Sequence, residues 1–183
     1  MDAGHRRALS LRRLETIGAF AVIVAGVLLH FVYGWSGGSR VVAAIAPVNE
    51  SVWEHLKLVL IPVVALGVVE AAWVRDRRRL WWAKLVEVLT ASGFVVVFFY
   101  TYTGALGVHS ILAVDILSFL VAVAGGQWLS YRILSSAMRR PPPPAVSVMA
   151  LVLLVVAFGV LTFTPPHIPL FQEVATGAYG PTL

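Results

Sequence analysis

Cysteine is absent from the 183-residue chain, which excludes disulfide bonds, thiolate metal sites and a thiol nucleophile. Charged residues are also scarce, at 13% of the chain against about a quarter in a typical soluble domain. The H-E-x-x-H motif of metalloproteases, the G-x-S-x-G nucleophile elbow and a phosphate-binding glycine loop are all missing. Any chemistry must therefore be argued from the placement of single residues.

Apolar residues dominate what is present. They make up 59% of the chain, and the mean hydropathy is +0.86. Apolar stretches near residues 15–35, 52–74, 82–103, 106–131 and 146–163 each approach the ~20 residues that cross a bilayer as a helix. We therefore predict an all-α polytopic membrane protein, with residues 1–183 forming a single transmembrane domain of five helices in a lipid bilayer.

The basic residues collect in alternate connections between these stretches. They are Arg6, Arg7, Arg12 and Arg13 before the first, Arg75, Arg77, Arg78, Arg79 and Lys84 around the start of the third, and Arg132, Arg139 and Arg140 after the fourth. Because cytoplasmic loops are rich in Lys and Arg, this pattern predicts a cytoplasmic N-terminus and an external C-terminus in the cell membrane. The net charge of +5 reflects this orientation, and we expect no nucleic-acid partner.

Histidines and carboxylates gather on the predicted outer side. Four of the five histidines lie there, namely His30, His55, His109 and His167. Random placement would scatter such residues over both sides of the membrane. Imidazoles combined with carboxylates are typical ligands of zinc and other divalent transition metals. We therefore predict that these four histidines are the candidate ligands of a divalent metal such as zinc.

Three carboxylates accompany these histidines, and each has a predicted catalytic role. A metal with an open coordination position lowers the pKa of a bound water molecule, and a nearby carboxylate then serves as a base. Glu54 or Glu50 is the predicted base, and Asp115 would orient one imidazole. The leading hypothesis is a metal-dependent hydrolase that acts on a lipid-borne or small substrate at the outer leaflet.

The same residues also have structural interpretations. Ser51 and Glu54 match a capping box, in which the carboxylate satisfies a free backbone N–H at the start of a helix. Asp115 could form an ion pair with Lys57 or His55. Trp35 and Trp53 fit an interfacial aromatic belt, and Glu70 and Glu87 are expected to face the Arg-rich loop of residues 75–79.

Two further functions stay open beside hydrolysis. One is a small transporter or proton- or cation-conducting protein, in which Asp115 and a histidine relay protons. Such a site should be reachable from both sides and lie near the middle of the membrane. The inner halves of the spans offer few polar residues for it beyond Thr90, Ser92, Ser118 and Gln127. The other is a non-catalytic structural or partner protein whose polar cluster only locks the bundle. The substrate and the oligomeric state are left open.

Several stretches of the chain resemble an uncharacterised family of bacterial multi-spanning membrane proteins, the domain of unknown function 6512. These stretches are HFVYGWSG at 30–37, PVNESVWEHLKL at 47–58, YTYTGALGVHSILAVDI at 100–116, GQWLSYRIL at 126–134, TPPHIPLF at 164–171 and TGAYG at 176–180. The resemblance implies a multi-spanning membrane fold and no assigned reaction. Its motifs contain the residues of the predicted outer cluster.

Overall fold

The computed structural model describes residues 3–136 and 141–181, and it describes side chains from residue 11 onward. The elements are α1 (Ala3–Trp35), α2 (Arg40–Ala43), α3 (Val52–His55), α4 (Lys57–Glu70), α5 (Arg77–Leu106), α6 (Leu112–Ser135), α7 (Pro144–Phe163) and the 3-10 helix η1 (Pro169–Phe171). Five segments are long and apolar enough to cross a membrane: Leu11–Trp35, Val52–Glu70, Arg77–Leu106, Leu112–Ser135 and Pro144–Phe163. The prediction of an all-helical, five-span protein is confirmed.

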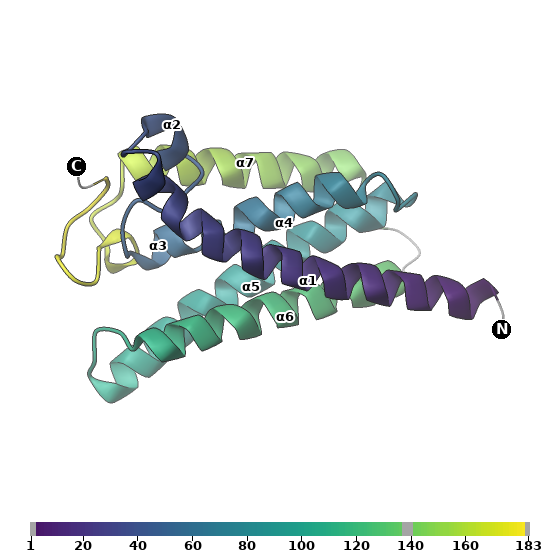
Figure 1. The fold of residues 1–183 in the computed structure, drawn as a ribbon, viewed down its shortest axis with the longest axis horizontal. Helices are drawn as coiled ribbons and strands as arrows, with labels where there is room; N and C mark the ends of the chain where they lie inside the picture. The colour runs from purple at the N-terminus through teal and green to yellow at the C-terminus, as the bar shows by residue number, and fades with distance from the viewer. Residues whose placement is uncertain (1–2, 137–140, 182–183) are drawn as a thin grey trace.

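The long helices run up and down the bundle in alternation (Figure 1). One end carries the starts of α1, α5 and α7 and the ends of α4 and α6, and we call it the N-terminal face. The opposite end, the C-terminal face, carries α2, α3, η1 and the C-terminal segment. This alternation brings polar residues that are distant in the sequence to the same end of the bundle.

The basic residues used to predict orientation follow this division where they are described. Arg12 and Arg13 lie near the start of α1, Arg75 and the Arg77–Arg79 run lie around the start of α5, and Arg132 lies in the last turn of α6. Arg139 and Arg140, and the side chains of Arg6 and Arg7, lie outside the described part of the chain. Which face is cytoplasmic remains the prediction of the positive-inside rule.

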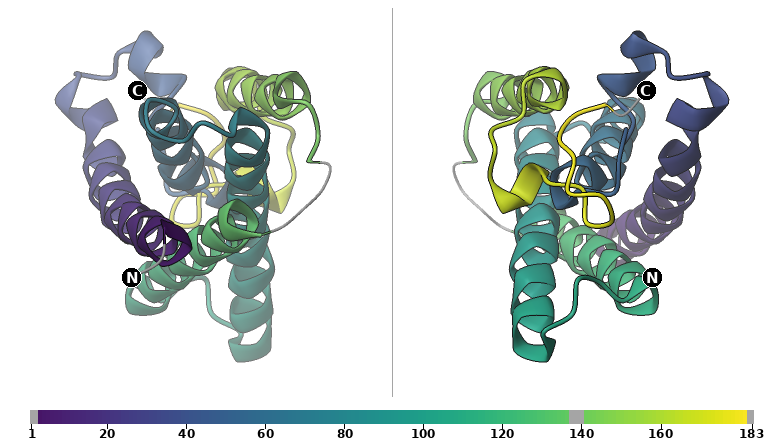
Figure 2. Two further views of the ribbon diagram at one scale, coloured as in Figure 1. Left: turned by 90° about the vertical axis from the view of Figure 1, so that its right-hand side faces the viewer. Right: turned by 90° about the vertical axis from the view of Figure 1, so that its left-hand side faces the viewer.

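The segment formed by α3 and α4 lies deepest in the bundle (Figure 2). In its most apolar window 56% of the residues are buried, against 17% for α1 and 22% for α7. Helix α1 packs against α4 and α6, α5 packs along α6, and α7 lies mainly against α5. Apolar residues such as Phe20 and Leu153 stay more than half exposed on the outside, where a bilayer would surround them.

The helix boundaries differ from the predicted spans in two places. The predicted spans 82–103 and 106–131 nearly touch, whereas the structure ends α5 at Leu106 and starts α6 at Leu112. Gly107 adopts a left-handed conformation (φ 65°) that closes α5, as glycine does at many helix ends. The predicted span 52–74 instead consists of two helices that meet at Leu56.

Trp53, expected in an interfacial aromatic belt, packs against two aromatic rings of the protein. Its ring stacks on Phe158 of α7 at a centroid distance of 3.9 Å and lies against Phe171 of η1 at 4.5 Å, tilted by 33°. Stacked aromatic rings of this kind add stability beyond the apolar area that they bury. Trp53 therefore holds α3, α7 and the C-terminal segment together, and this fixes the position of α3 at the C-terminal face.

Candidate metal centre

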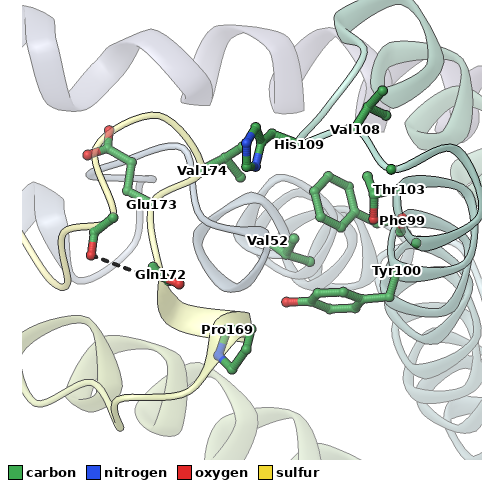
Figure 3. A pocket seen from close by; sticks show the side chains of 13 residues that line it. Val52, Phe99, Tyr100, Thr103, Val108, His109, Pro169, Gln172, Glu173 and Val174 are labelled. Carbon is green, nitrogen blue, oxygen red and sulfur yellow. Dashed lines mark hydrogen bonds between the residues drawn. The ribbon is translucent and has the colours of Figure 1, made fainter.

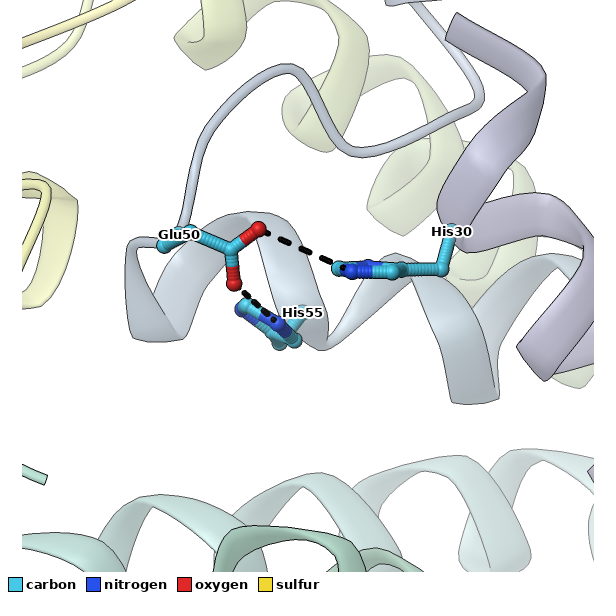
Figure 4. Close-up of side chains that lie close together, drawn as sticks. All are labelled: His30, Glu50 and His55. Atoms are coloured by element: carbon cyan, nitrogen blue, oxygen red, sulfur yellow. Dashed lines mark ion pairs between the residues drawn. The ribbon is translucent and has the colours of Figure 1, made fainter. Parts of the chain in front are cut away.

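The C-terminal face brings together His30, Glu50 and His55 (Figure 4). His30 lies near the end of α1, and His55 is the last residue of the short helix α3. Glu50 lies in the turn that leads into α3. Asn49 shapes this turn, because its side-chain oxygen accepts a hydrogen bond from the Ser51 backbone N–H at 3.0 Å. The three side chains therefore come from a long helix, a turn and a short helix.

The Glu50 carboxylate lies between the two imidazole rings. Its Oε2 is 3.2 Å from Nε2 of His55, and its Oε1 is 3.6 Å from Nε2 of His30. The ring centroids of the two histidines are 5.3 Å apart. Both imidazoles thus present the same nitrogen, Nε2, toward one carboxylate.

A backbone carbonyl sets the proton position on His55. Its Nδ1 lies 2.9 Å from the carbonyl oxygen of Ser51. Because a carbonyl oxygen can only accept a hydrogen bond, Nδ1 must carry the proton. In the neutral ring Nε2 then has a lone pair that faces Glu50, whereas in the protonated ring Nε2 donates a hydrogen bond to the carboxylate. Metal-bound histidines commonly donate their second ring N–H to a carbonyl in this way.

The three ligand atoms fit a metal ion. They all lie within 4.8 Å of one another, and they form the only group of this kind among the residues that the structure describes. Zinc bonds of ~2.0–2.2 Å would place tetrahedral ligand atoms about 3.4 Å apart, so closure by roughly 1 Å would complete the site. A set of two histidines and one glutamate leaves a fourth position open for water or substrate.

The site is accessible and strongly polar. The side chain of Glu50 is 57% exposed, and those of His30 and His55 are about one-third exposed, at 30% and 33%. The pKa of Glu50 lies below its ordinary value, because His55 hydrogen-bonds to the carboxylate and both imidazoles add positive charge, although partial burial opposes the shift. Glu50 is therefore ionised at neutral pH, as a metal ligand must be.

Glu54, a predicted catalytic base, lies in a separate buried network. Its Oε2 is 2.6 Å from Nζ of Lys57, and its Oε1 accepts a hydrogen bond from the Thr162 hydroxyl at 2.8 Å. The backbone N–H of Val48 also donates to Oε2, at 3.2 Å. The carboxylate does not close a capping box, because Ser51 N–H donates to Asn49 instead. Glu54 therefore has protein partners for both oxygens.

Lys57 completes this network and shows what the network does. Its ammonium donates to the carbonyl oxygens of Ala43 at 2.8 Å and Ala46 at 3.2 Å, as well as to Thr162 Oγ1 at 2.6 Å. These partners lie at the end of α2, just after α2 and on α7. The Glu54–Lys57 pair thus ties three parts of the C-terminal face together, which supports the structural interpretation of Glu54.

Asp115, on helix α6, is hydrogen-bonded to Tyr102 of helix α5. It accepts a hydrogen bond from the hydroxyl of Tyr102 at 2.5 Å, and that hydroxyl accepts one from the backbone N–H of Ile111 at 3.1 Å. The predicted partners of Asp115 were His55, Lys57 or another imidazole. The structure instead gives its carboxylate a tyrosine partner, which joins α5 to the beginning of α6.

His109 lines a pocket of about 560 Å³ at the C-terminal face (Figure 3). The other walls come from the end of α5, the first residue of α3 and the C-terminal segment, including Tyr100, Val52 and Glu173. His109 is exposed and does not join the group of His30, Glu50 and His55. The pocket has the size of sites that bind small molecules.

His167 also lies away from the group of three. Its exposed ring packs against Tyr179 at a centroid distance of 4.6 Å, within the C-terminal segment. Of the four histidines predicted as ligands, the structure therefore brings two together, His30 and His55. The third ligand atom comes from Glu50, which the sequence had suggested as a base.

Similarity to known proteins assigns the family. The sequence profile of DUF6512, a family of unknown function, matches residues 5–181. The chain belongs to DUF6512. The resemblance seen in the sequence is thereby confirmed. No curated protein and no solved structure matches the chain. The family name assigns no reaction, so the function of this DUF6512 protein must be argued from its geometry.

This DUF6512 protein has a second polar cluster that was not predicted from the sequence. Glu15, Glu70, Lys84 and Glu87 are all buried near the N-terminal face. Glu70 and Glu87 were expected to face the Arg-rich loop, but both lie 3.0 Å from Lys84 inside the bundle. Their positions near the ends of apolar stretches resemble those of interfacial residues. The only signal was the spacing of Lys84 and Glu87, which places them on one helical face.

Proposed function

We propose that this chain is an integral membrane protein that binds a divalent transition metal such as zinc through His30, Glu50 and His55. The observation that carries the proposal is that one ligand atom from each of these residues lies within 4.8 Å of the others, while the hydrogen bond from Nδ1 of His55 to the Ser51 carbonyl leaves Nε2 as the ligand atom. In the neutral ring Nε2 then has a lone pair that faces the carboxylate, and either a proton on Nε2 or a metal ion bound by both groups removes the repulsion. The two histidines and one glutamate supply that cation with three ligands.

The reaction class that this ligand set supports best is hydrolysis. Three protein ligands leave one position open, where a bound ion would lower the pKa of a water molecule to about 7. Glu50 has two oxygens, and the one that does not bind the ion would be the base that accepts a proton from that water. With the orientation predicted from the basic residues, the site faces outside, and the substrate is lipid-borne or small.

The pocket lined by His109 offers a place for the body of such a substrate. Val52, which lines the pocket, lies three residues before His55 on α3, so the two share one side of that short helix. The walls combine apolar groups with the polar groups of Tyr100, His109 and Glu173. This combination suits an amphipathic molecule with an apolar part and a polar part.

Zinc titration of the purified full chain tests the metal site. Isothermal calorimetry should detect binding to the wild type, and His55→Ala should weaken it by at least about 10- to 100-fold, because a ligand is lost. His167→Ala is the matched control, since it removes an exposed histidine outside the group. An absence of zinc binding in the wild type, or an equal loss in both variants, would overturn the proposal.

Hydrolysis is tested separately from metal binding. Lipid extracts incubated with the zinc-loaded protein should yield hydrolysed products by mass spectrometry, and a chelator should stop their formation. The Glu50→Gln variant should lose this activity as well. If zinc binds at the site but no product forms with or without a chelator, the site is structural and the hydrolase assignment fails.

A further inference from the structure

The buried cluster near the N-terminal face joins four of the five long helices. Glu15 comes from α1, Glu70 from α4, Lys84 and Glu87 from α5, and Gln127 from α6. Their relative exposures are between 0% and 3%. Ionisable residues inside a membrane bundle are costly and are rarely retained without a function. The cluster is also independent of the candidate metal centre, which lies at the opposite face.

One ammonium group faces three carboxyl groups in this cluster. Nζ of Lys84 is 3.0 Å from Glu70, 3.0 Å from Glu87 and 3.8 Å from Glu15. If every group were ionised, the cluster would carry two uncompensated negative charges with no solvent contact. Carboxylates that share one low-dielectric site cannot all be ionised, so at least one holds a proton.

The ion pairs described for the three carboxyl groups all involve Lys84. Helix α6 contributes the neutral Gln127, and its own charged residues have other partners: Asp115 binds Tyr102, and Arg132 stacks on Trp128. Helix α7 contains no ionisable residue. The charge balance of the cluster is therefore decided by Glu15, Glu70, Lys84 and Glu87 alone among the described contacts.

The hydrogen bonds show the same imbalance. Gln127 donates its side-chain N–H to Oε2 of Glu15. Glu87 has the buried Ser130 hydroxyl as a partner, but Oε1 of Glu15, Glu70 and Gln127 all lack a hydrogen-bond donor within the described part of the chain. Every one of these buried atoms is an acceptor. Protons on the carboxyl groups would turn acceptors into donors and so supply what is missing.

Glycines pack the helices tightly around the cluster. A Cβ atom added at Gly18 would lie 3.0 Å from Gln127, one at Gly67 would lie 3.1 Å from Lys84, and one at Gly126 would lie 3.2 Å from Glu87. Such close packing disfavours a hydrated ion, and the Lys84 ammonium repels a metal cation. The ligand that fits both the charge and the space is a proton.

We propose that Glu15, Glu70 and Glu87, gathered around Lys84, form a proton-binding site inside the membrane bundle. Charge neutrality is reached when the three carboxyl groups share two protons, since Lys84 balances the third. Glu15 is the carboxyl group farthest from the ammonium and therefore the best holder of a proton. Binding and release leave all covalent bonds of the chain unchanged except the carboxyl O–H bonds.

Infrared spectroscopy of the full chain in lipid nanodiscs tests this site directly. Protonated carboxyl groups have their own C=O stretch, and wild-type protein at pH 7 should show it. The band should shift in D2O, because an exchangeable proton becomes a deuteron. Each of the variants Glu15→Gln, Glu70→Gln and Glu87→Gln should reduce the band by roughly half, since one carboxyl fewer needs one proton fewer.

Glu54→Gln is the matched control, because Glu54 is equally buried but is balanced by Lys57 alone. It should leave the band unchanged. Any one of the three cluster variants that folds, as judged by its circular dichroism, suffices for the comparison. The absence of a protonated-carboxyl band in the wild type overturns the proposal. So does a band that does not shift in D2O, or one that no cluster variant reduces.

Discussion

The two faces of the bundle use similar side chains in opposite ways. At the C-terminal face, Glu50 lies between two imidazoles, and its side chain is 57% exposed. Near the N-terminal face, three glutamates surround Lys84 with almost no exposure. The open site has free lone pairs that an ion from solution can reach. The closed site is short of positive charge, and only a proton fits it.

A third region shows what a buried charge looks like when it is balanced. Glu54 and Lys57 are buried as deeply as the cluster around Lys84, but one cation meets one anion at 2.6 Å. Backbone and hydroxyl groups occupy their remaining hydrogen-bonding positions. Burial alone therefore does not make a proton site. The difference lies in the ratio of carboxylates to ammonium groups.

The largest effect should follow from removing the central cation with Lys84→Met. Three buried carboxyl groups would lose their only positive partner, so the free energy of unfolding should fall by about 5 kcal/mol. Unfolding by SDS in mixed micelles measures the change. Adding Glu70→Gln and Glu87→Gln to the same chain should recover much of the loss. A variant as stable as the wild type would show that Lys84 is not the partner of these groups.

A smaller effect should separate the balanced pair from the cluster. Glu54→Gln leaves the Lys57 ammonium buried without a counter-charge and should cost about 3 kcal/mol of unfolding free energy. Glu15→Gln resembles a carboxyl group that is already protonated and should cost less than about 1 kcal/mol. The same SDS titration compares the two variants. Equal losses of unfolding free energy in the two variants would mean that Glu15 is ionised. The cluster around Lys84 would then not differ in protonation from the Glu54–Lys57 pair.

The remaining prediction concerns the pH dependence of metal binding at the open site. Protons compete with a metal for imidazole nitrogens, whose ordinary pKa is near ~6.5. Zinc affinity at the site of His30, Glu50 and His55 should therefore fall as pH decreases, by up to about 100-fold between roughly pH 7.5 and 5.5. Calorimetric titrations at several pH values measure this. An affinity that is constant over this range would argue against histidine ligands.

Hydropathy predicted the number and type of the membrane-crossing segments because each segment is long and apolar along its own sequence. The positions of the breaks were harder to predict. The connection between α5 and α6 depends on the left-handed conformation of Gly107, and the junction of α3 and α4 at Leu56 lies between His55 and Lys57. The first break was predicted, between residues 103 and 106, but not its position; the second was not, because polar residues there also fit the start of a single span.

The residues of the candidate sites were also predicted only in part. Alternation of the spans placed His30 and His55 at one face, and the structure brings them to the same carboxylate. The same alternation suggested His109 and His167 as ligands. These two residues lie on a connection and on the C-terminal segment, where the loop backbone determines where each side chain points. The cluster around Lys84 was missed because residues near the end of a span can face either the loop or the interior.

The sequence by itself determined that five helices are long and apolar enough to cross a membrane and which polar residues lie near each end, because hydropathy and chain alternation are properties of the sequence alone. The tertiary structure decided which of these residues meet and whether solvent reaches them. That outcome depends on the rotation of each helix and on close contacts such as those at Gly18, Gly67 and Gly126. Helix packing sets these features, and no single segment encodes them.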